Sequence, residues 1–234
     1  MLESLLDFIF PKRCVGCKKF GEYLCSSCFA KISFAQKYFC GVCGHASYNG
    51  LTHPKCEGKY SIDGIFPILN YHGLLKKILY QYKYNPHLSD LTRVLGDFLY
   101  EGFIQNETLM KDIQKGECAF ISVPLHEKRQ KTRGYNQSEL LAEYVSKKLG
   151  SKYLKDILVR KKNTTPQFKL PKSQRHENIK GAFAVLKREH IQGCTIFLVD
   201  DITTTGATLL ECANILKRNG AQKVYGIALG HEEK

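Results

Sequence analysis

Hydrophobic and polar positions follow two different patterns along this chain, and the change occurs near residue 60. After that point, short apolar runs of strand length are separated by stretches whose apolar residues recur at helical spacing. The apolar runs predict strands at Ile62–Tyr71 (interrupted at Pro67), Ala119–Val123, Ile157–Val159, Thr195–Val199 and Val224–Leu229. Helical spacing predicts helices at Gly73–Tyr84, Asp90–Ile104, Asn136–Lys148 and Ala207–Arg218. Strands that alternate with helices predict an α/β fold, with a mostly parallel sheet flanked by helices.

Two local features add a buried central strand and two helix ends to this prediction. The run Thr195–Val199 has no polar alternation, so we expect both of its faces to be covered. Gly150 and Gly220 follow two of the predicted helices, where a glycine in the left-handed conformation commonly ends a helix.

The residues before position 60 are rich in cysteine and turn residues and show little periodicity. We therefore divide the chain into an N-terminal metal-binding domain at residues 1–60 and an α/β domain at residues 61–234. At the start, apolar residues recur at helical spacing at Leu2, Leu5, Leu6 and Ile9. This predicts a helix that docks on the protein's own core, with a membrane-surface or partner contact as the alternative. Glu3 and Asp7 argue against a secretory signal peptide, and no apolar run approaches the roughly 20 residues of a membrane-spanning helix.

Four pairs of possible metal ligands follow, each with two intervening residues. The ligands are Cys14, Cys17, Cys25, Cys28, Cys40, Cys43, His53 and Cys56. A Cys-x-x-Cys turn directs two thiolates at one tetrahedral metal, so two pairs complete a closed structural zinc site and four pairs suffice for two zinc ions. His45 competes with His53 for the histidine position. A redox-active dithiol is the weaker alternative, because it does not explain four clustered pairs.

The remaining cysteines, Cys118, Cys194 and Cys212, lie among apolar neighbours and are expected as buried thiols. This distribution favours a cytosolic metal-binding protein over a secreted, disulfide-bonded one.

A turn rich in threonine follows the predicted strand Thr195–Val199 and precedes a helix. It contains Asp200 and Asp201, and then Thr203, Thr204, Thr205, Gly206, Ala207 and Thr208. Ligands of open α/β sheets bind outside the carboxyl ends of strands, and successive N–H groups at a helix N-terminus favour an anion. Two adjacent carboxylates suit two neighbouring ribose hydroxyls better than they suit a phosphate. An NTPase acidic motif is the alternative, but the chain lacks a Gly-x-x-x-x-Gly-Lys-[Ser/Thr] loop.

Two further segments are basic. Residues 122–137 follow the strand Ala119–Val123 and carry Lys128, Arg129, Lys131 and Arg133. Arginines suit bidentate contacts with phosphate oxygens, so this segment is a candidate site for a pyrophosphate with its magnesium, or else a solvated loop. Residues 152–188 hold eleven Lys or Arg. Their central part, Asn163–Lys172, has two prolines and weak periodicity, which predicts an irregular basic lid.

Four segments together closely resemble the ComF family of competence proteins: the cysteine pairs, VPLHEKRQKTRGYNQS, TTPQ…SQRHENIKGAF and VDDITTTGATL. The resemblance covers nearly the whole chain and implies a zinc ribbon joined to a type I phosphoribosyltransferase domain that binds 5-phosphoribosyl-1-pyrophosphate (PRPP). It implies that Asp200 and Asp201 hold the ribose hydroxyls at the reaction centre and that residues 203–208 hold the 5′-phosphate. It further implies a pyrophosphate site at Pro124, Leu125, Arg129 and Arg133, and a flexible loop with Arg160, Gln167 and Arg175.

Three hypotheses about function remain. The first is a magnesium-dependent phosphoribosyltransferase, although no residue evidently selects an acceptor. The second is a cytoplasmic DNA-uptake protein that binds single-stranded DNA, which the net charge of +13 and the aromatics Tyr153, Phe168 and Phe183 would suit. The third is a scaffold peripheral to the inner membrane, in contact with it or with DNA-uptake proteins. We favour the second.

Overall fold

The structure is a computed structural model that describes residues 11–84, 91–167 and 170–232. The helix expected within the first ten residues, the expected helix start at Asp90, and Phe168 lie outside the described residues. Within the described ranges, no helix combines the length and the apolar character needed to cross a membrane.

Within these ranges the main sheet has five strands, and a separate hairpin has two. The main strands are β1 (Gly64–Asn70), β2 (Cys118–Ser122), β3 (Lys152–Tyr153), β6 (Thr195–Thr203) and β7 (Lys223–His231). The antiparallel hairpin is formed by β4 (Leu158–Arg160) and β5 (Phe183–Val185).

The described α-helices are α2 (Ser26–Phe29), α3 (Gly73–Tyr84), α4 (Leu91–Ile104), α5 (Glu107–Gln114), α6 (Glu127–Arg133), α7 (Gln137–Lys148), α8 (Lys172–Ile179) and α9 (Ala207–Arg218). Short 3₁₀ turns lie at η1 (Tyr48–Gly50), η2 (Pro54–Cys56) and η5 (Arg188–His190).

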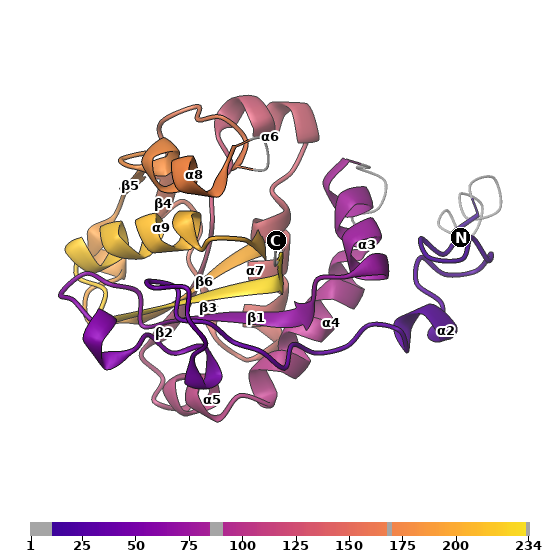
Figure 1. The fold of residues 1–234 in the computed structure, drawn as a ribbon, viewed down its shortest axis with the longest axis horizontal. Coiled ribbons are helices and arrows are strands. Elements are labelled where there is room, and N and C mark those ends of the chain that lie inside the picture. Colours follow the sequence, from indigo (N-terminus) through magenta and orange to yellow (C-terminus); the bar gives the residue numbers. More distant parts are fainter. Residues whose placement is uncertain (1–10, 85–90, 168–169, 233–234) are drawn as a thin grey trace.

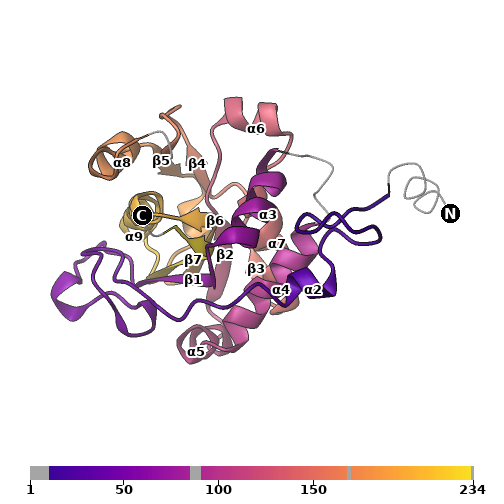
Figure 2. The same cartoon turned by 45° about the vertical axis from the view of Figure 1, so that its right-hand side comes forward.

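The main sheet is parallel, with the strand order β1-β7-β6-β2-β3. The strand order switches between β2 and β6: from β2 the chain passes through α7 on one face to β3, and from β6 it passes through α9 on the other face to β7 (Figures 1 and 2). Such a switch point opens a crevice at the carboxyl ends of the two strands, where ligands of this fold class bind.

Helices cover both faces of the sheet, as the apolar run Thr195–Val199 predicted. On β6, Phe197 and Val199 pack into the core formed with α3, α4 and α7. The alternate residues Ile196 and Leu198 pack into the core formed with α9. All four side chains are fully buried, as expected for a central strand of a parallel sheet. The predicted fold class is therefore confirmed.

Pro67 does not interrupt β1, contrary to the sequence prediction. The strand runs from Gly64 to Asn70, and Pro67 lies opposite Ala228 of β7. This is possible because β1 is an edge strand, with β7 as its neighbour in the main sheet and isolated backbone pairings of Leu51 with Gly64 and of Phe34 with Leu69 on its outer side. A proline without an N–H donor is tolerated in an edge strand.

Other differences concern the segments around the crevice. Strand β6 continues through Asp200 and Asp201 to Thr203, still paired with β7, so the two aspartates lie within the end of the strand. The basic segment 122–137, expected as a loop, contains the two-turn helix α6. The basic segment 152–188 contains the hairpin β4–β5 and the helix α8, and its part from 163 to 167 is irregular as predicted. Helix α5 was not predicted.

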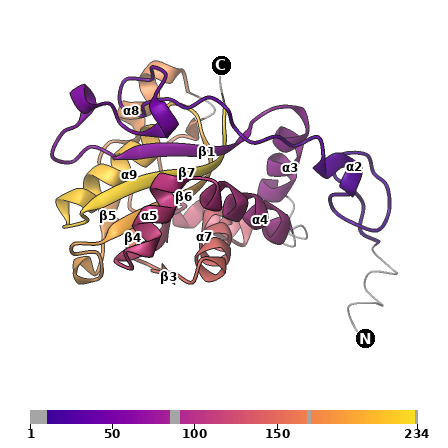
Figure 3. The same cartoon turned by 90° about the horizontal axis from the view of Figure 1, so that it is seen from below.

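The cysteine-rich region does not form one compact body. Its first part, around α2, packs against α4, where Phe29 and Phe98 stack with ring centroids 4.7 Å apart. Its second part leads into β1 and lies along the β1 edge of the sheet, as the violet segment of Figure 3 shows. Backbone pairing of Leu51 with Gly64 attaches this second part to the start of β1.

Candidate functional site

A cavity of about 860 Å³ opens at the carboxyl ends of the central strands. Its lining includes every residue that the sequence assigned to sugar, phosphate or pyrophosphate binding: Pro124, Leu125, Arg129, Arg133, Asp200, Asp201, Thr203, Thr204, Thr205, Gly206, Ala207 and Thr208. Arg160 and Gln167 from the basic segment 152–188 line it as well. The cavity has the size of a small-molecule site.

The phosphate loop, residues 203–208, forms one end of the cavity. Gly206 has φ 74° and immediately precedes α9, so the loop turns directly into the N-terminus of a three-turn helix. A Cβ atom at this position would lie 2.9 Å from Ile65 Cδ1, so both the conformation and the packing require glycine. Unpaired N–H groups at a helix N-terminus and nearby hydroxyls suit an anion such as a phosphate.

The loop is held in place from the neighbouring strand. The amide of Glu232 donates to Thr203 O at 2.9 Å, and His231 Nε2 donates to Thr204 O at 2.7 Å. These bonds continue the β6–β7 ladder into the loop, so its first residues have a fixed backbone conformation.

The acid pair, Asp200 and Asp201, lies between the phosphate loop and α3. Lys83 Nζ pairs with Asp201 Oδ2 at 3.0 Å, and Ser138 Oγ donates to Asp200 Oδ1 at 3.0 Å. Burial and the adjacent Asp201 carboxylate raise the pKa of Asp200 to about 7, and Lys83 and Ser138 offset only part of this effect. The negative charge of the pair is thus unfavourable in the ligand-free protein, and hydroxyl groups that donate hydrogen bonds to the carboxylates would stabilise it.

Arginines form a further part of the lining. Arg129 Nη2 donates to Thr164 O at 2.5 Å, and Arg160 donates to the Thr164 hydroxyl. Burial lowers the pKa of both guanidinium groups, and like charge adds to this, since Arg133 acts on Arg129 and Arg129 acts on Arg160. Two cationic groups held close together, with no ion pair to a carboxylate in the part of the chain that the structure describes, have room for an anionic ligand.

Helix α3 forms a wall of the cavity that the sequence did not predict. It contributes Lys76, Tyr80, Lys83 and Tyr84. Tyr80 and Tyr84 are 61 % and 51 % exposed, and their ring centroids lie 4.9 Å apart. Their spacing at i and i+4 on the polar side of the predicted helix was the signal that could have marked them.

The end of α3 is fixed by the start of α7. Tyr135 Oη donates to Tyr82 O, and Gln137 Nε2 donates to Lys83 O at 3.4 Å. These bonds satisfy carbonyl groups of the last helical turn, which have no partner within the helix. They place Lys83 opposite the acid pair, although the two segments are far apart in sequence.

The basic segment 152–188 contributes fewer residues to the cavity than the sequence suggested. Gln167 Nε2 reaches Thr208 Oγ1 at 3.5 Å, so this residue lies over the phosphate loop. Arg175, assigned to the flexible loop, is 3 % exposed and does not line the cavity; its Nε donates to Leu170 O at 3.1 Å. Its role here is to hold the irregular segment together.

Two of the three aromatic residues expected to contact single-stranded DNA, Tyr153 and Phe183, are packed at least partly inward. Phe183 is 4 % exposed, and Tyr153 donates or accepts a hydrogen bond with Ser122 at 3.0 Å. The ring of Phe183 is therefore closed to base stacking, and that of Tyr153 is partly covered.

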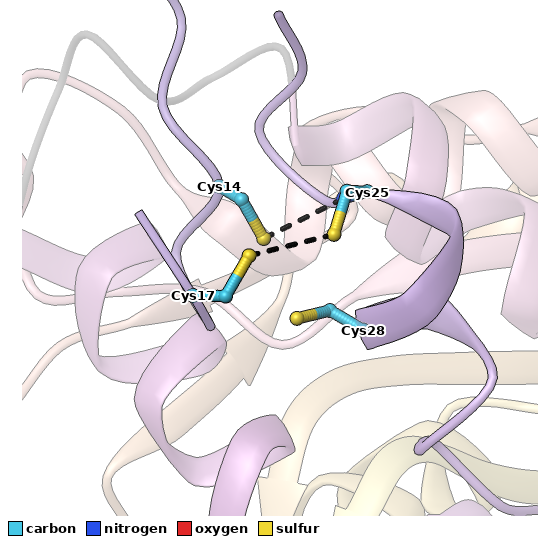
Figure 4. A group of neighbouring side chains, drawn as sticks. All are labelled: Cys14, Cys17, Cys25 and Cys28. Carbon is cyan, nitrogen blue, oxygen red and sulfur yellow. Dashed lines mark hydrogen bonds between the residues drawn. The ribbon is translucent and has the colours of Figure 1, made fainter. Parts of the chain in front are cut away.

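The first cluster, Cys14, Cys17, Cys25 and Cys28, brings four thiols together within 4.8 Å of one another. Figure 4 shows their side chains pointing toward a common centre, two from the first knuckle and two from the start of α2. Burial opposes ionisation of Cys14, but N–H groups of Cys17, Cys25 and Gly16 lower its pKa to about 6. Four convergent sulfur ligands of this kind fit a tetrahedral zinc ion.

The second cluster consists of Cys40, Cys43, His53 and Cys56, whose ligand atoms also lie within 4.8 Å of one another. His53 Nδ1 lies 3.4 Å from Cys43 Sγ, and His53 Nε2 contacts Ala46 O at 3.0 Å. A second ring nitrogen fixed by a carbonyl is typical of a metal-binding histidine. The structure thus groups His53 with the cysteines; His45 is exposed and outside the cluster.

Comparison with known families matches both halves of the chain. Residues 5–57 match the double zinc ribbon domain, and residues 136–229 match the phosphoribosyl transferase domain.

Similar proteins cover most of the chain. Competence protein F of Haemophilus influenzae is 32 % identical over 230 residues, which span 94 % of this chain and 97 % of that protein. DNA utilization protein YhgH of Escherichia coli strain K12 is 30 % identical over 206 residues, 86 % of this chain and 87 % of that protein. Competence protein ComFC of Bacillus subtilis is 24 % identical over 206 residues, 85 % of this chain and 80 % of that protein.

Proposed function

This chain belongs to the ComF family of competence proteins, which combine a double zinc ribbon with a phosphoribosyltransferase domain, and from that premise we propose that it binds PRPP and acts in DNA uptake during natural transformation. We further propose that it does so by handling single-stranded DNA. Magnesium accompanies the sugar diphosphate, and zinc stabilises the N-terminal ribbons.

One observation carries the proposal of PRPP: a single cavity is lined by the phosphate loop, the acid pair, and the arginines Arg129, Arg133 and Arg160. These three groups suit the 5′-phosphate, the ribose hydroxyls and the pyrophosphate, respectively. Two buried polar atoms among the described residues, Arg160 Nε and Gln167 Oε1, have no hydrogen-bond partner. Both belong to residues that line the cavity, and a buried donor such as Arg160 Nε or acceptor such as Gln167 Oε1 without a partner is a group that a ligand can satisfy.

Magnesium fits this site by the chemistry of its donors. The cavity contains carboxylates at Asp200, Asp201 and Glu232, and magnesium in phosphate sites is held by one or two carboxylates together with phosphate oxygens and waters. When bound, it would neutralise the charge of the pyrophosphate.

Calorimetry with PRPP and magnesium tests the ligand. Asp200→Asn together with Asp201→Asn should weaken binding by at least about 100-fold, because each lost charge-assisted hydrogen bond is worth about 1.5–3 kcal/mol. Asp156→Asn, a change at an exposed aspartate far from the lining, serves as the matched control. Unchanged affinity in the double variant would remove the proposed site.

The proposal of single-stranded DNA rests on charge and on the exposed aromatics of α3. The net charge is +13, and Tyr80 and Tyr84 present exposed rings beside Lys76 and Arg133. Base stacking on an aromatic ring contributes about 1–3 kcal/mol. We therefore expect Tyr80→Ala with Tyr84→Ala to weaken oligonucleotide binding at least about fivefold, with Tyr48→Ala, at an 88 % exposed tyrosine of the second ribbon, as the control.

Salt dependence provides an independent check of this part. Affinity for a single strand should fall steeply and linearly on logarithmic axes as salt rises, since each contacted phosphate releases counterions. Absent or salt-independent binding would contradict a DNA-handling role.

We place the protein in the cytoplasm, with peripheral contact to the inner membrane or to DNA-uptake proteins. Two clusters of metal-ligand type, rather than disulfides, support a reducing compartment. Deletion of residues 1–10 should release the protein from a membrane fraction; unchanged fractionation would contradict a contact through this segment.

A catalytically active phosphoribosyltransferase is the second candidate. The α3 wall favours it, because the cavity extends past the acid pair to Tyr80 and Tyr84 and so leaves room for a planar acceptor. Catalysis would consist mainly of positioning and charge stabilisation. Release of pyrophosphate across a panel of nucleobases and amines is the test, and no release above the Asp200→Asn background would leave a binding protein.

A further inference from the structure

The second zinc cluster lies directly behind the phosphate loop. Phe39, the residue before Cys40, stacks on His231 with ring centroids 4.0 Å apart and an interplanar angle of 28°. His231 in turn donates to Thr204 O at 2.7 Å. One ring therefore connects the first ligand of the cluster with the backbone of the loop.

A second contact connects the knuckle itself with the loop. Gly41 lies between the cluster ligands Cys40 and Cys43, and a Cβ atom on it would lie 2.5 Å from Ile65 Cδ1. A Cβ atom on Gly206 would lie 2.9 Å from the same Ile65 atom, and 3.7 Å from Gly41 O. The knuckle, Ile65 and the turn of the phosphate loop are thus packed without spare room.

The geometry of this knuckle depends on its cluster. Cys40 N–H donates to His45 O at 2.9 Å, Gly44 N–H donates to Cys40 O at 2.8 Å, and Phe39 pairs with Ala46. These short-range bonds close a turn whose outer ligand, Cys43, is exposed. Small metal modules of this kind lose their fold without the metal, so Phe39 and Gly41 would then lose their fixed positions.

The first cluster contacts other elements than the phosphate loop, so it serves as an internal control for the effect of zinc on that loop. It packs against α3 and α4: a Cβ atom on Gly16 would lie 2.9 Å from Leu74 Cδ1, and Phe29 stacks on Phe98. Figure 3 shows α2 well apart from the violet segment that carries the second cluster.

We propose that the second zinc cluster is a positioning element for the phosphate loop, so that zinc at this cluster and the phosphate of the ligand bind cooperatively. Phe39 and His231 carry the coupling, as positioning residues that do not touch the ligand. The ligand's identity rests on the proposed function, whereas the coupling itself requires only that the loop bind a phosphate. Because coupling is reciprocal, the ligand must raise the zinc affinity by the factor by which zinc raises the ligand affinity.

Zinc release to a chromogenic chelator is the first measurement, made on the full chain with and without PRPP or inorganic phosphate. We expect two phases, and the phase of the second cluster should slow at least about fivefold with ligand while the phase of the first stays constant. Cys17→Ser and Cys43→Ser, which each disable one cluster, assign the phases. Equal slowing of both phases, or of neither, would overturn the proposal.

Ligand affinity in positioning variants is the second measurement. Phe39→Leu and His231→Leu should retain the full zinc content and yet weaken PRPP and phosphate binding about tenfold. Tyr48→Ser, in the same ribbon but away from the loop, should leave affinity unchanged. If both positioning variants keep their full zinc content and bind PRPP and phosphate with wild-type affinity, the proposed coupling is wrong, whereas the proposed ligand is unaffected. If the wild-type chain binds phosphate but not PRPP, the proposed ligand fails and the coupling stands; if it binds neither, both fail.

Discussion

Replacing Asp200 by Asn should stabilise the ligand-free protein at neutral and higher pH, although it removes a ligand-binding group. Asp200 is half-buried beside the buried Asp201, and its pKa is raised to about 7 from the usual 3.8. Because the folded state holds this proton more tightly than the unfolded chain, unfolding releases it between about pH 4 and pH 7, and stability falls as pH rises through that range. Above about pH 7 the loss is complete and constant. An asparagine has no such charge and still accepts the hydrogen bond from Ser138.

The size of the effect follows from the pKa. A rise from 3.8 to about 7 corresponds to about 4 kcal/mol, and water in the open cavity screens the charge, so we expect about 1–2 kcal/mol at about pH 8. For a chain of this length, this is a rise in Tm of roughly 2–8 °C.

Thermal unfolding at about pH 5 and about pH 8, in zinc-containing buffer, measures this effect. The quantity of interest is the change with pH in the difference between variant and wild type, in which the titration of all other groups cancels. Asp156→Asn, at an exposed aspartate with φ 57°, a conformation that asparagine also tolerates, should show no such change. If the difference for Asp200→Asn is the same at both pH values, or if it becomes destabilising as pH rises, the reasoning about a buried acid pair is wrong.

Other expectations concern single groups. Arg129→Ala should weaken pyrophosphate binding about 10- to 100-fold in calorimetry, since a charge-assisted hydrogen bond is lost, whereas Arg93→Ala at an exposed site should not. Arg175→Ala should lower the free energy of unfolding by about 1–3 kcal/mol and leave magnesium–PRPP affinity within about twofold if the segment stays ordered, because its side chain is buried away from the cavity; a large loss of affinity at unchanged stability would restore its assignment as a ligand contact. Gly96→Ala should cost about 1–3 kcal/mol in urea unfolding, because the added Cβ would lie 2.2 Å from the Tyr144 ring; a neutral result would show that this ring moves freely.

Most of the fold could be predicted because its signals are local. Helices α3, α7 and α9 begin and end within one residue of the prediction, since apolar spacing and the glycines at 150 and 220 mark them. The errors occur where the position of a segment in the folded protein, rather than its local sequence, determines its structure. Pro67 is compatible with a strand only because β1 lies at the sheet edge, and the strand order cannot be read from one segment. Helix α6 is short and has no buried residue, so no apolar pattern in the sequence predicts it.

The candidate site likewise contains residues that the sequence predicted from local signals and residues that it missed. The phosphate loop and the arginine segment each occupy a continuous stretch directly after a strand, and position relative to a strand end was enough to find them. Lys83 and Ser138 were missed because their partners, Asp201 and Asp200, are contributed by another part of the chain. Arg175 was overestimated because a basic residue within a basic segment gives no sign of whether it faces solvent, ligand or core.

The edge position of β1 accounts for both features that the sequence did not reveal. Pairing of β1 with β7 carries the segment before the strand to the rear of the phosphate loop, where Phe39 meets His231 at the end of β7. The same pairing carries the segment after the strand, α3, to the front of the cavity, where Lys83 meets Asp201. One strand thus brings the second zinc cluster and the aromatic wall to opposite sides of one loop. A perturbation of either side should therefore be measurable at the other.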